Sequence, residues 1–472
     1  MRSLRTLLPL ILVLTAVAVL SAQERHDGKA LYAKHCAQCH GADLQGGNAQ
    51  SLVDGVWNHG AGTGYVRRNI KHGITHLGMP AYESTLSDGE INAITRFLIE
   101  QEKVYDPKPR PTPETIQSQE YDIRVEAVAE GLEVPWAVDF IDAKTMLVTE
   151  RAGRLRVVRD GKLDARAVRG TPAVVAEGQG GLLDVAADPE VAKNGWIYLA
   201  HSHAPPGETR ERPPAMTRIV RGRIRDHAWV DEQVVWEAPP ETNLPTRHHY
   251  GSRIVFDEKG RLYFAIGDRG ARPMAQDPAK PNGKIHRVNR DGTIPTGNPF
   301  VGKEGALPSV FSCGHRNPQG LAFHPATGGL WETEHGPMGG DEINLIRPGL
   351  NYGWPEISYG RHYDGRVLTK FERKPGMEQP VLFYRPSTAV CGLDFYRGAL
   401  FPKWRNHLLV GALKYESVDL LTVEKDRVMH SETIVKGMGR VRDVACGPDG
   451  AVYVVLNRPG KVIRLTPIRE RF

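Results

Sequence analysis

The spacing of hydrophobic residues divides the chain into a short helical part and a much longer part that is rich in strands. Between Ile91 and Leu98, apolar residues recur at the spacing of one helix face. Ser87 and Glu90 precede this run as a capping box, and Asp27 stands where it can cap an earlier helix. We therefore expect a small all-α domain in residues 23–103.

Beyond residue 118 the helical spacing almost disappears and a different pattern recurs. An apolar strand is followed by a turn with Asp, Pro or Gly, a second apolar strand, a loop, and a third strand rich in Arg, Val and Leu. Six copies occur, at residues 137–158, 182–220, 253–288, 319–345, 392–421 and 443–465. They predict a six-bladed β-propeller, because one copy is too small to bury a core without its neighbours. We expect Ile123 and Val125 to close the ring by joining the last blade; a β-sandwich, the alternative, would need shorter and more even spacing.

The predicted fold is therefore multidomain, with an all-α domain followed by an all-β six-bladed β-propeller in residues 118–472. Residues 104–117 are predicted to be the linker between them. Its prolines alternate with other residues, at Pro107, Pro109, Pro111 and Pro113. Such a run favours extended polyproline geometry and a semi-rigid spacer.

Residues 1–22 have the features of a secretory signal peptide. Arg2 and Arg5 give a positive start, residues 7–20 are apolar, and Ser21 and Ala22 form a small-residue exit. We expect a periplasmic or otherwise secreted protein. An uncleaved signal would instead leave the protein membrane-associated, although the apolar run is short for a membrane span.

The net charge and the positions of the cysteines limit which partners and which disulfide bonds we expect. The formal net charge is only +6 over 472 residues and the basic residues are scattered, so we expect no nucleic-acid partner. Cys313, Cys391 and Cys446 lie far apart in the sequence. We expect them to be buried small hydrophobes; one disulfide among them is the alternative, and its pairing does not follow from the sequence.

The remaining two cysteines belong to a motif that indicates a cofactor. Cys36 and Cys39 are followed directly by His40, which is the attachment motif of a c-type haem. The thiols would form thioethers to the porphyrin and His40 would ligate the iron. A redox disulfide or half of a zinc site is the alternative.

Met79 is the candidate for the second axial ligand of the iron. A methionine thioether in that position raises the reduction potential of a c-type cytochrome. The segment around Met79 and the following helix resemble class I cytochrome c, whereas the alternative is a core methionine. His35, His72 and His76 are competing imidazoles, and each is expected to be a surface or core residue.

Basic residues lie on predicted loops of distant propeller blades. These residues are Arg316, Lys414, Arg440 and Arg442. If they converge at the mouth of the central channel, they suit a ligand with several carboxylates or phosphates. The other reading is solvated surface charge, and spacing alone does not decide between the two.

Four ordered motifs carry a family resemblance. They are GHRNPQG at residues 314–320, EHGP at 334–337, DEIN at 341–344 and NYGWP at 351–355. Together they resemble the soluble quinoprotein glucose and aldose sugar dehydrogenase family, over about residues 130–466. The resemblance implies a six-bladed propeller that binds pyrroloquinoline quinone (PQQ), a tricarboxylic ortho-quinone, together with calcium.

The resemblance also implies a role for individual residues in holding the cofactor. The residues expected to hold or orient PQQ are Arg316, Asn317, Gln319, Lys414, Arg440 and Arg442. The carbonyls of Gly336 and Pro337 would bind the calcium that touches PQQ, since a hard cation prefers oxygen ligands and can polarise the quinone carbonyl. Asp341, Glu342 and the carbonyl of Tyr352 match the surroundings of a further, structural calcium; a charged surface turn is the alternative.

His249 occupies the general-base position of the resembled family. A neutral imidazole can take the proton of a sugar's anomeric hydroxyl while hydride passes to the quinone. His249 is favoured over His248 because it directly precedes the aromatic-Gly-Ser-Arg turn. Gln179 matches a position near the substrate.

Two departures from the glucose-oxidising members bear on the substrate. They carry an aspartate where this chain has His248, and Cys391 stands where proline or serine is expected. We therefore expect a quinohaemoprotein that oxidises an aldose and passes electrons to its haem, and then to a soluble cytochrome or a respiratory chain. The alternatives are a non-sugar alcohol or an aldehyde such as sorbosone as substrate, or a carbohydrate-binding propeller without catalysis whose haem is a tether.

Overall fold

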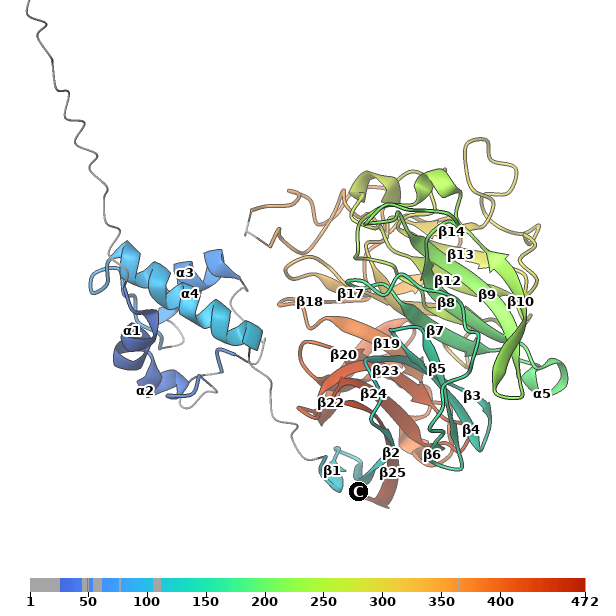
Figure 1. The fold of residues 1–472 in the computed structure, drawn as a ribbon, viewed down its shortest axis with the longest axis horizontal. Helices are drawn as coiled ribbons and strands as arrows, with labels where there is room; N and C mark the ends of the chain where they lie inside the picture. Colours follow the sequence, from blue (N-terminus) through green and yellow to red (C-terminus); the bar gives the residue numbers. More distant parts are fainter. Residues whose placement is uncertain are drawn as a thin grey trace, which may run out of the picture. The chain divides into compact units, whose positions relative to one another are not determined.

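The structure is a computed structural model that describes residues 26–44, 49, 51–53, 62–75, 78–104, 112–363 and 366–471. The chain divides into two compact units, one with residues 1–53 and 66–104 and the other with residues 54–65 and 105–472 (Figure 1). The predicted signal peptide, His76 and residues 105–111 of the predicted linker lie outside the described residues. Among the residues that are described, no helix is long and apolar enough to cross a membrane.

The described residues of the first unit form four helices. They are α1 (Gly28–His35), α2 (Ala37–His40), α3 (Thr63–His72) and α4 (Asp88–Val104). Asp27 Oδ1 accepts the backbone N–H groups of Lys29 and Ala30, which confirms the predicted cap of α1. The predicted capping box is confirmed as well, because Ser87 and Glu90 exchange hydrogen bonds at the start of α4.

Helices α1 and α4 pack closely where Gly28 meets Ala93. A Cβ atom on Gly28 would lie 2.2 Å from the carbonyl oxygen of Ala93, so only glycine allows this approach. One turn further along, the rings of Tyr32 and Phe97 are in contact, with centroids 5.7 Å apart. This contact brings the haem-attachment motif at the end of α1 under the C-terminal helix of the unit.

The second unit is a six-bladed β-propeller, as predicted. The strands of the first three blades are β3 (Pro135–Asp142), β4 (Thr145–Glu150), β5 (Arg154–Arg159), β6 (Lys162–Leu163); β7 (Leu182–Ala187), β8 (Ile197–His203), β9 (Met216–Arg225), β10 (Ala228–Trp236); β11 (Ile254–Phe256), β12 (Leu262–Ile266), β13 (Lys284–Val288) and β14 (Val310–Cys313). Those of the last three are β15 (Pro318–Phe323), β16 (Leu330–Glu334), β17 (Asp341–Ile346), β18 (Leu382–Tyr384); β19 (Val390–Phe395), β20 (Leu408–Ala412), β21 (Ser417–Glu424), β22 (Arg427–Lys436); and β23 (Arg440–Cys446), β24 (Val452–Arg458), β25 (Gly460–Glu470), β2 (Tyr121–Glu130) and β1 (Thr115–Gln117).

The last blade closes the ring with strands from both ends of the propeller. Strand β2 pairs with β25, and in this register Ile123 lies opposite Pro467 and Val125 opposite Leu465. The predicted role of Ile123 and Val125 is therefore confirmed. Strand β1 adds to the outer edge of β2, so residues 115–117 of the predicted linker pair with the sheet.

Each blade contains a fourth strand outside the three-strand pattern of the sequence. These strands are β6, β10, β14, β18, β22 and, in the last blade, β2, which is the predicted closing strand. Several of them are too short for an alternating pattern, such as the two residues of β6. The first strands of successive blades lie side by side around the ring, and β23 returns to β3.

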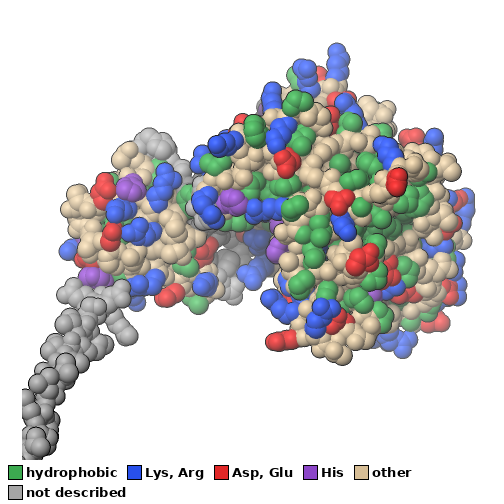
Figure 2. Space-filling model, turned by 90° about the horizontal axis from the view of Figure 1, so that it is seen from above, with side chains coloured by type: hydrophobic (Ala, Val, Ile, Leu, Met, Phe, Trp, Pro, Cys, Tyr) green, Lys and Arg blue, Asp and Glu red, His purple; other side chains and the backbone are tan. Residues whose placement is uncertain are grey.

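The hydrophobic cores lie between neighbouring blades. One cluster joins Leu147 and Leu155 of the first blade to Leu182 and Leu199 of the second, and all four are almost fully buried. Similar clusters join the other neighbours, including the last blade and the first. On the face seen in Figure 2, basic and acidic side chains are interspersed with one another.

Candidate active site

A cavity of about 200 Å³ lies where loops and strand ends of several blades converge. Its lining residues are Val134, Trp136, Arg151, Gln179, Leu183, Tyr250, Gly251, Asn317, Gln319, His335, Ala389, Leu413, Arg440, Arg442 and Asn457. Five of the residues predicted from the sequence are in this set: Gln179, Asn317, Gln319, Arg440 and Arg442. Lys414 directly follows the lining residue Leu413 and is half-buried.

A chain of hydrogen bonds connects the predicted cofactor residues with one another. Arg442 Nη2 donates to Gln319 Oε1 at 2.8 Å, and Gln319 Nε2 donates to Asn317 Oδ1 at 3.1 Å. The same Asn317 oxygen accepts the N–H of Gly251 at 3.2 Å. The three side chains, from two blades, are thus fixed relative to the loop that carries His249.

The guanidinium of Arg442 is held against the indole of Trp136. Its central carbon lies 4.3 Å from the ring centroid, and Arg253 approaches Trp136 as well, at 4.7 Å. Burial lowers the pKa of Arg442 to about 10, so the guanidinium stays charged near neutral pH. A buried cation that opens onto a cavity attracts an anionic ligand.

Several polar atoms around the cavity are buried and have no hydrogen-bond partner in the protein. They include His335 Nε2, Tyr250 Oη and Asn457 Oδ1. Buried polar groups are normally paired, so these atoms indicate that a polar ligand completes the cavity. Together with Arg151, Arg440 and Arg442, they suit a compact ligand with several carboxylates and carbonyls, and a tricarboxylic quinone fits this description.

His249 lies in a strained turn beside the cavity. Its φ angle is +57°, in the left-handed region that non-glycine residues rarely adopt, and Gly251 follows at +64°. The N–H of His249 donates to Gln179 Oε1 at 2.7 Å, so the predicted base and the predicted substrate-side residue are joined. A Cβ on Gly251 would lie 2.7 Å from Ala265 O, which explains the glycine at this position.

The imidazole of His249 is oriented by Asp268. His249 Nδ1 lies 2.6 Å from Asp268 Oδ1, and Trp354 Nε1 donates to the other carboxylate oxygen at 2.8 Å. Burial raises the pKa of Asp268, but the hydrogen bond and charge of His249, the N–H of Gly270 and the charge of Arg316 together outweigh it, so the net shift is downward. Burial, followed by the charge of Arg316, lowers the pKa of His249 to about 4. His249 is therefore neutral at pH 7, and a proton on Nδ1 leaves Nε2 as the basic nitrogen.

A second, much smaller pocket brings together residues that the resemblance connected with calcium. Gly336, Pro337, Glu342 and Tyr352 line it. The carbonyl of Gly336 accepts Arg316 Nη1 at 2.7 Å, and that of Pro337 accepts Ser387 Oγ at 3.0 Å. Oxygen atoms predominate here, which is the donor set that calcium prefers.

Asp341 has a different surrounding from its neighbour Glu342. Its carboxylate accepts the N–H groups of Gly336 at 3.0 Å, Ala389 at 2.6 Å and Val390 at 3.4 Å. It therefore ties the Gly336 loop to strand β19 and is not among the residues that line the small pocket. The geometry gives Asp341 a structural role in shaping this loop.

The haem-attachment motif lies at the junction of α1 and α2. Cys36 is half-buried, Cys39 is exposed and His40 is half-buried. Met79 pairs with Ile74 through two backbone hydrogen bonds in the same unit. All five cysteines are unpaired, and Cys313, Cys391 and Cys446 are buried as expected. His72 is an exposed residue that lies 3.2 Å from Glu83.

Comparison with known sequences assigns both units to families. Residues 132–464 match the family described as Glucose / Sorbosone dehydrogenase, which is well over half of the chain. The chain belongs to the glucose/sorbosone dehydrogenase family. Residues 23–98 match the family described as Cytochrome C oxidase, cbb3-type, subunit III, so a cytochrome c domain precedes the dehydrogenase domain.

Relatives of this glucose/sorbosone dehydrogenase include characterised proteins and solved structures. The aldose sugar dehydrogenase YliI of Escherichia coli is 40% identical over 352 residues, which cover 73% of this chain and 93% of that protein. The apo-form structure of the E. coli aldose sugar dehydrogenase matches with a TM-score of 0.68 at 38% identity, covering 73% of this chain and 99% of that one. A PQQ-bound aldose sugar dehydrogenase from Streptomyces coelicolor matches with a TM-score of 0.61 at 25% identity, covering 74% and 99%.

Some residues of the glucose/sorbosone dehydrogenase site carried no recognisable signal in the sequence. Asp268 follows strand β12 in an ordinary Gly-Asp-Arg-Gly turn, and nothing in that turn indicates a partner in another loop. Trp136, Arg151 and Asn457 were missed for the same reason. His335 stands inside a recognised motif, and its position before Gly336 was the one signal that could have identified it.

Proposed function

We propose that this dehydrogenase oxidises an aldose at the anomeric carbon with PQQ and passes the electrons to a covalent haem c in its own cytochrome domain. We further propose that it does so in the periplasm, with calcium bound beside PQQ. The observation that carries the proposal is the neutral His249, fixed by Asp268 and Gln179 beside a cavity lined by arginines. A base that takes the proton of the anomeric hydroxyl, beside an anion-binding cavity for the acceptor of the hydride from the anomeric carbon, is what this oxidation requires.

Arg440, Arg442 and Arg151 would hold the carboxylates of PQQ, with Asn317 and Gln319 orienting it. Bound PQQ would supply the quinone that accepts the hydride. The carbonyls of Gly336 and Pro337 are the candidates to hold calcium, and their hydrogen bonds to Arg316 and Ser387 would have to rearrange or be shared for that purpose. Glu342 and the Tyr352 carbonyl are the candidate ligands of a structural calcium.

His249 would take the proton of the sugar's anomeric hydroxyl on Nε2. Its pKa of about 4 means that the base is ready at neutral pH without a prior deprotonation. Asp268 keeps the ring in the tautomer that accepts a proton at Nε2 and stabilises the imidazolium that results. Gln179 holds the backbone of His249 and faces the same cavity, so it can also contact the substrate.

A haem takes one electron at a time, so each oxidised sugar requires two reductions of the haem. His40 and Met79 are the proposed iron ligands, with Cys36 and Cys39 as the thioether anchors. A soluble cytochrome or a respiratory chain would accept the electrons from the haem. The signal-like residues 1–22 favour a periplasmic or secreted location, and retention of this segment would make the protein membrane-associated.

Stopped-flow haem absorbance tests the proposal directly. The full chain, loaded with calcium and PQQ, is mixed with a panel of aldoses, and haem reduction is followed. We expect fast reduction that requires both PQQ and sugar, and that falls by about 10²–10⁴-fold in His249→Ala. Haem reduction without PQQ, or an unaffected His249→Ala variant, would contradict the assignment.

His248 is the reason to test a second class of substrate. Its ring lies 4.6 Å from that of His249, at the position where glucose-oxidising members carry an aspartate. The same panel should therefore include a non-sugar alcohol and a sugar-derived aldehyde such as sorbosone. Reduction by these compounds and not by aldoses would move the assignment to the aldehyde, and PQQ binding without any reduction would favour a non-catalytic propeller.

A further inference from the structure

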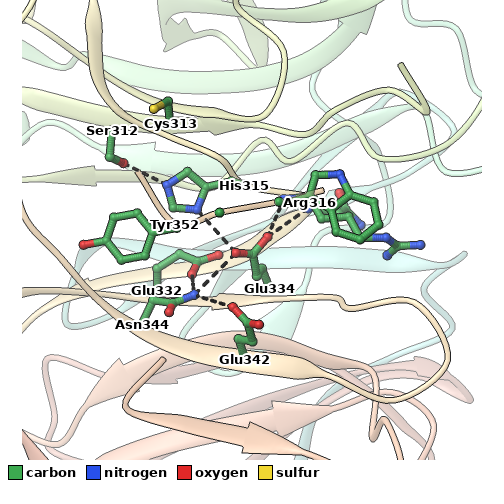
Figure 3. Close-up of polar contacts among 12 residues, drawn as sticks. Ser312, Cys313, His315, Arg316, Glu332, Glu334, Glu342, Asn344 and Tyr352 are labelled. Atoms are coloured by element: carbon green, nitrogen blue, oxygen red, sulfur yellow. Dashed lines mark hydrogen bonds and ion pairs between the residues drawn. The ribbon is translucent and has the colours of Figure 1, made fainter. Parts of the chain in front are cut away.

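A buried group of ionisable side chains lies below the small pocket, between strands β14, β15, β16 and β17. One ligand atom each from His315, Glu332 and Glu334 lies within 4.8 Å of the others (Figure 3). None of the three side chains is more than 5% exposed. Glu342 approaches the same place, because Asn344 Nδ2 reaches Glu332 at 3.0 Å and both Glu334 and Glu342 at 3.4 Å.

The hydrogen bonds in this group do not balance its negative charge. Glu334 Oε2 accepts the N–H groups of Arg316 at 2.5 Å and Asn317 at 3.3 Å, and Glu334 Oε1 lies 3.4 Å from His315 Nδ1. Glu332 has only the neutral amide of Asn344, and its Oε1 is buried without any partner. Among the described residues, no lysine or arginine forms an ion pair with Glu332, Glu334 or Glu342.

Figure 3 shows the carboxyl groups of Glu332 and Glu334 pointing towards one another, with the ring of His315 above the pair. Two carboxylates that face each other in a dry interior are strongly destabilising unless a positive charge lies between them. The nearest guanidinium, that of Arg316, donates to the carbonyls of His335 and Gly336 instead. The unpartnered oxygen of Glu332 therefore indicates a missing cation at this position.

We propose that His315, Glu332 and Glu334 bind a divalent metal ion inside the propeller. The donor set is one imidazole nitrogen and carboxylate oxygens, without sulfur, which suits a divalent ion of the manganese or calcium type better than a thiolate metal. A single proton shared by Glu332 and Glu334 is the competing explanation, and metal content and thermal unfolding distinguish the two. The ion acts as a structural element, since the group has no exposed face.

Glu332 separates this site from the calcium residues expected from the family. It does not line the small pocket that contains Glu334, Glu342 and Tyr352. Glu334 links the new site to catalysis, because the same carboxylate holds the backbone of Arg316 and Asn317. Loss of the ion should therefore loosen the cofactor-binding segment even though the ion touches neither PQQ nor the substrate.

Metal analysis by mass spectrometry tests the site without reference to activity. The full chain, purified without added metal or PQQ and passed through metal-free buffer, is compared with the variants Glu332→Gln and Glu150→Gln. Glu150 is a matched control, because its buried carboxylate is paired with Arg154 and Arg156 and needs no ion. We expect the wild type and Glu150→Gln to retain a divalent metal and Glu332→Gln to lose one equivalent of it.

Thermal unfolding is the second measurement, because the two explanations predict different effects of Glu332→Gln on the unfolding midpoint. If a metal is bound, Glu332→Gln lowers the unfolding midpoint, and chelation followed by Mn²⁺ or Ca²⁺ raises it again only in the wild type. If the carboxyl pair is held by a proton, Glu332→Gln is neutral or stabilising, since it removes a buried acid. Equal metal content in wild type and Glu332→Gln, or loss of metal in Glu342→Gln alone, overturns the proposal. These measurements use protein without PQQ, so their outcome does not depend on whether the proposed sugar oxidation is correct.

Discussion

The ring of His249 and the carboxylate of Asp268 are joined by a 2.6 Å hydrogen bond across two loops of one blade. Trp354, from the next blade, holds the other oxygen of Asp268 at 2.8 Å. The proposed base is thus supported from two directions before any ligand binds, so little reorganisation would be needed when a proton is transferred.

Replacement of Asp268 by asparagine should show separately how Asp268 orients the His249 ring and how it affects the pKa of His249. An amide would no longer fix the proton on His249 Nδ1, so kcat should fall by about 10²-fold, the lower end of what a general base contributes. In the wild type, the rate should rise with pH through about 4 and then reach a plateau, because His249 acts in its neutral form. Asp268 raises the pKa of His249. In Asp268→Asn the rise of the rate with pH should therefore occur at lower pH. The pH profile of haem reduction measures both effects.

Asp164→Asn is the control for that experiment, because Asp164 faces His227 at 3.5 Å away from the cavity. It should leave both the rate and the pH profile unchanged. An Asp268→Asn variant with wild-type kcat would show that the hydrogen bond has no part in proton transfer.

Trp136 should matter for cofactor affinity through Arg442. Trp136→Leu removes the surface on which the guanidinium stacks, and a cation–π contact of this kind contributes about 1–2 kcal/mol when desolvated. We expect PQQ to bind about tenfold more weakly, measured by absorbance titration. Trp196→Leu is the matched control. Trp196 also stacks with two arginines, Arg221 and Arg223, but does not line the cavity. Equal losses in both variants would point to a general loss of stability instead.

Met79→Leu tests the second iron ligand. If the thioether ligates the haem, its removal should lower the haem reduction potential by on the order of 100 mV, because a methionine ligand favours the ferrous state. Spectroelectrochemical titration of the full chain measures this shift. Met429→Leu, at an exposed position of the propeller, should not change the potential. An unchanged potential in Met79→Leu would assign the position to another ligand.

His201 should make the propeller sensitive to acid. Both of its ring nitrogens are buried without a partner, and burial, with His203 and Arg218 nearby, lowers its pKa to about 3. The unfolded chain binds this proton near pH 6.5, so stability is present above that pH and is lost as the pH falls towards 3. Between pH 7 and pH 4 the wild type should lose about 3 kcal/mol of unfolding free energy through this residue alone.

His201→Phe should therefore be less acid-sensitive than the wild type by that amount, measured by denaturant unfolding at the two pH values. His430→Phe, at an exposed site, is the reference and should follow the wild type. A parallel decline of all three proteins would assign the acid sensitivity to other groups.

The architecture was largely predictable because it is repetitive. Apolar strands and Asp- or Gly-containing turns recur six times, and closure by Ile123 and Val125 follows from the need to complete the last sheet. The fourth strands of the other five blades were not predictable; β6, for example, has two residues, and β10 pairs with β9 through shifted registers. The short β1 was hidden by the proline-rich composition beside it.

The candidate site was predictable only where long motifs carry it. Gln179, Asn317, Gln319, Arg440 and Arg442 stand in recognisable segments and meet at one cavity. Asp268 and Trp136 could not be found in this way, because their roles arise from partners in other loops and strands. Glu332 shows the same limit: two residues before Glu334, it shares a face of β16 with that residue, but the burial of both depends on the pairing of β16 with β15 and β17.

The pairing of β2 with β25 also constrains how the protein is made. Val125 emerges from the ribosome early, whereas its partner Leu465 is among the last residues to be synthesised. The ring therefore cannot close until almost the whole chain is available, and contacts so distant in sequence form slowly. The cytochrome domain lies entirely before β2, so its helices can fold, and its cysteines can meet haem, while the propeller is still an open array of blades. In this protein the cytochrome domain is complete before the dehydrogenase domain.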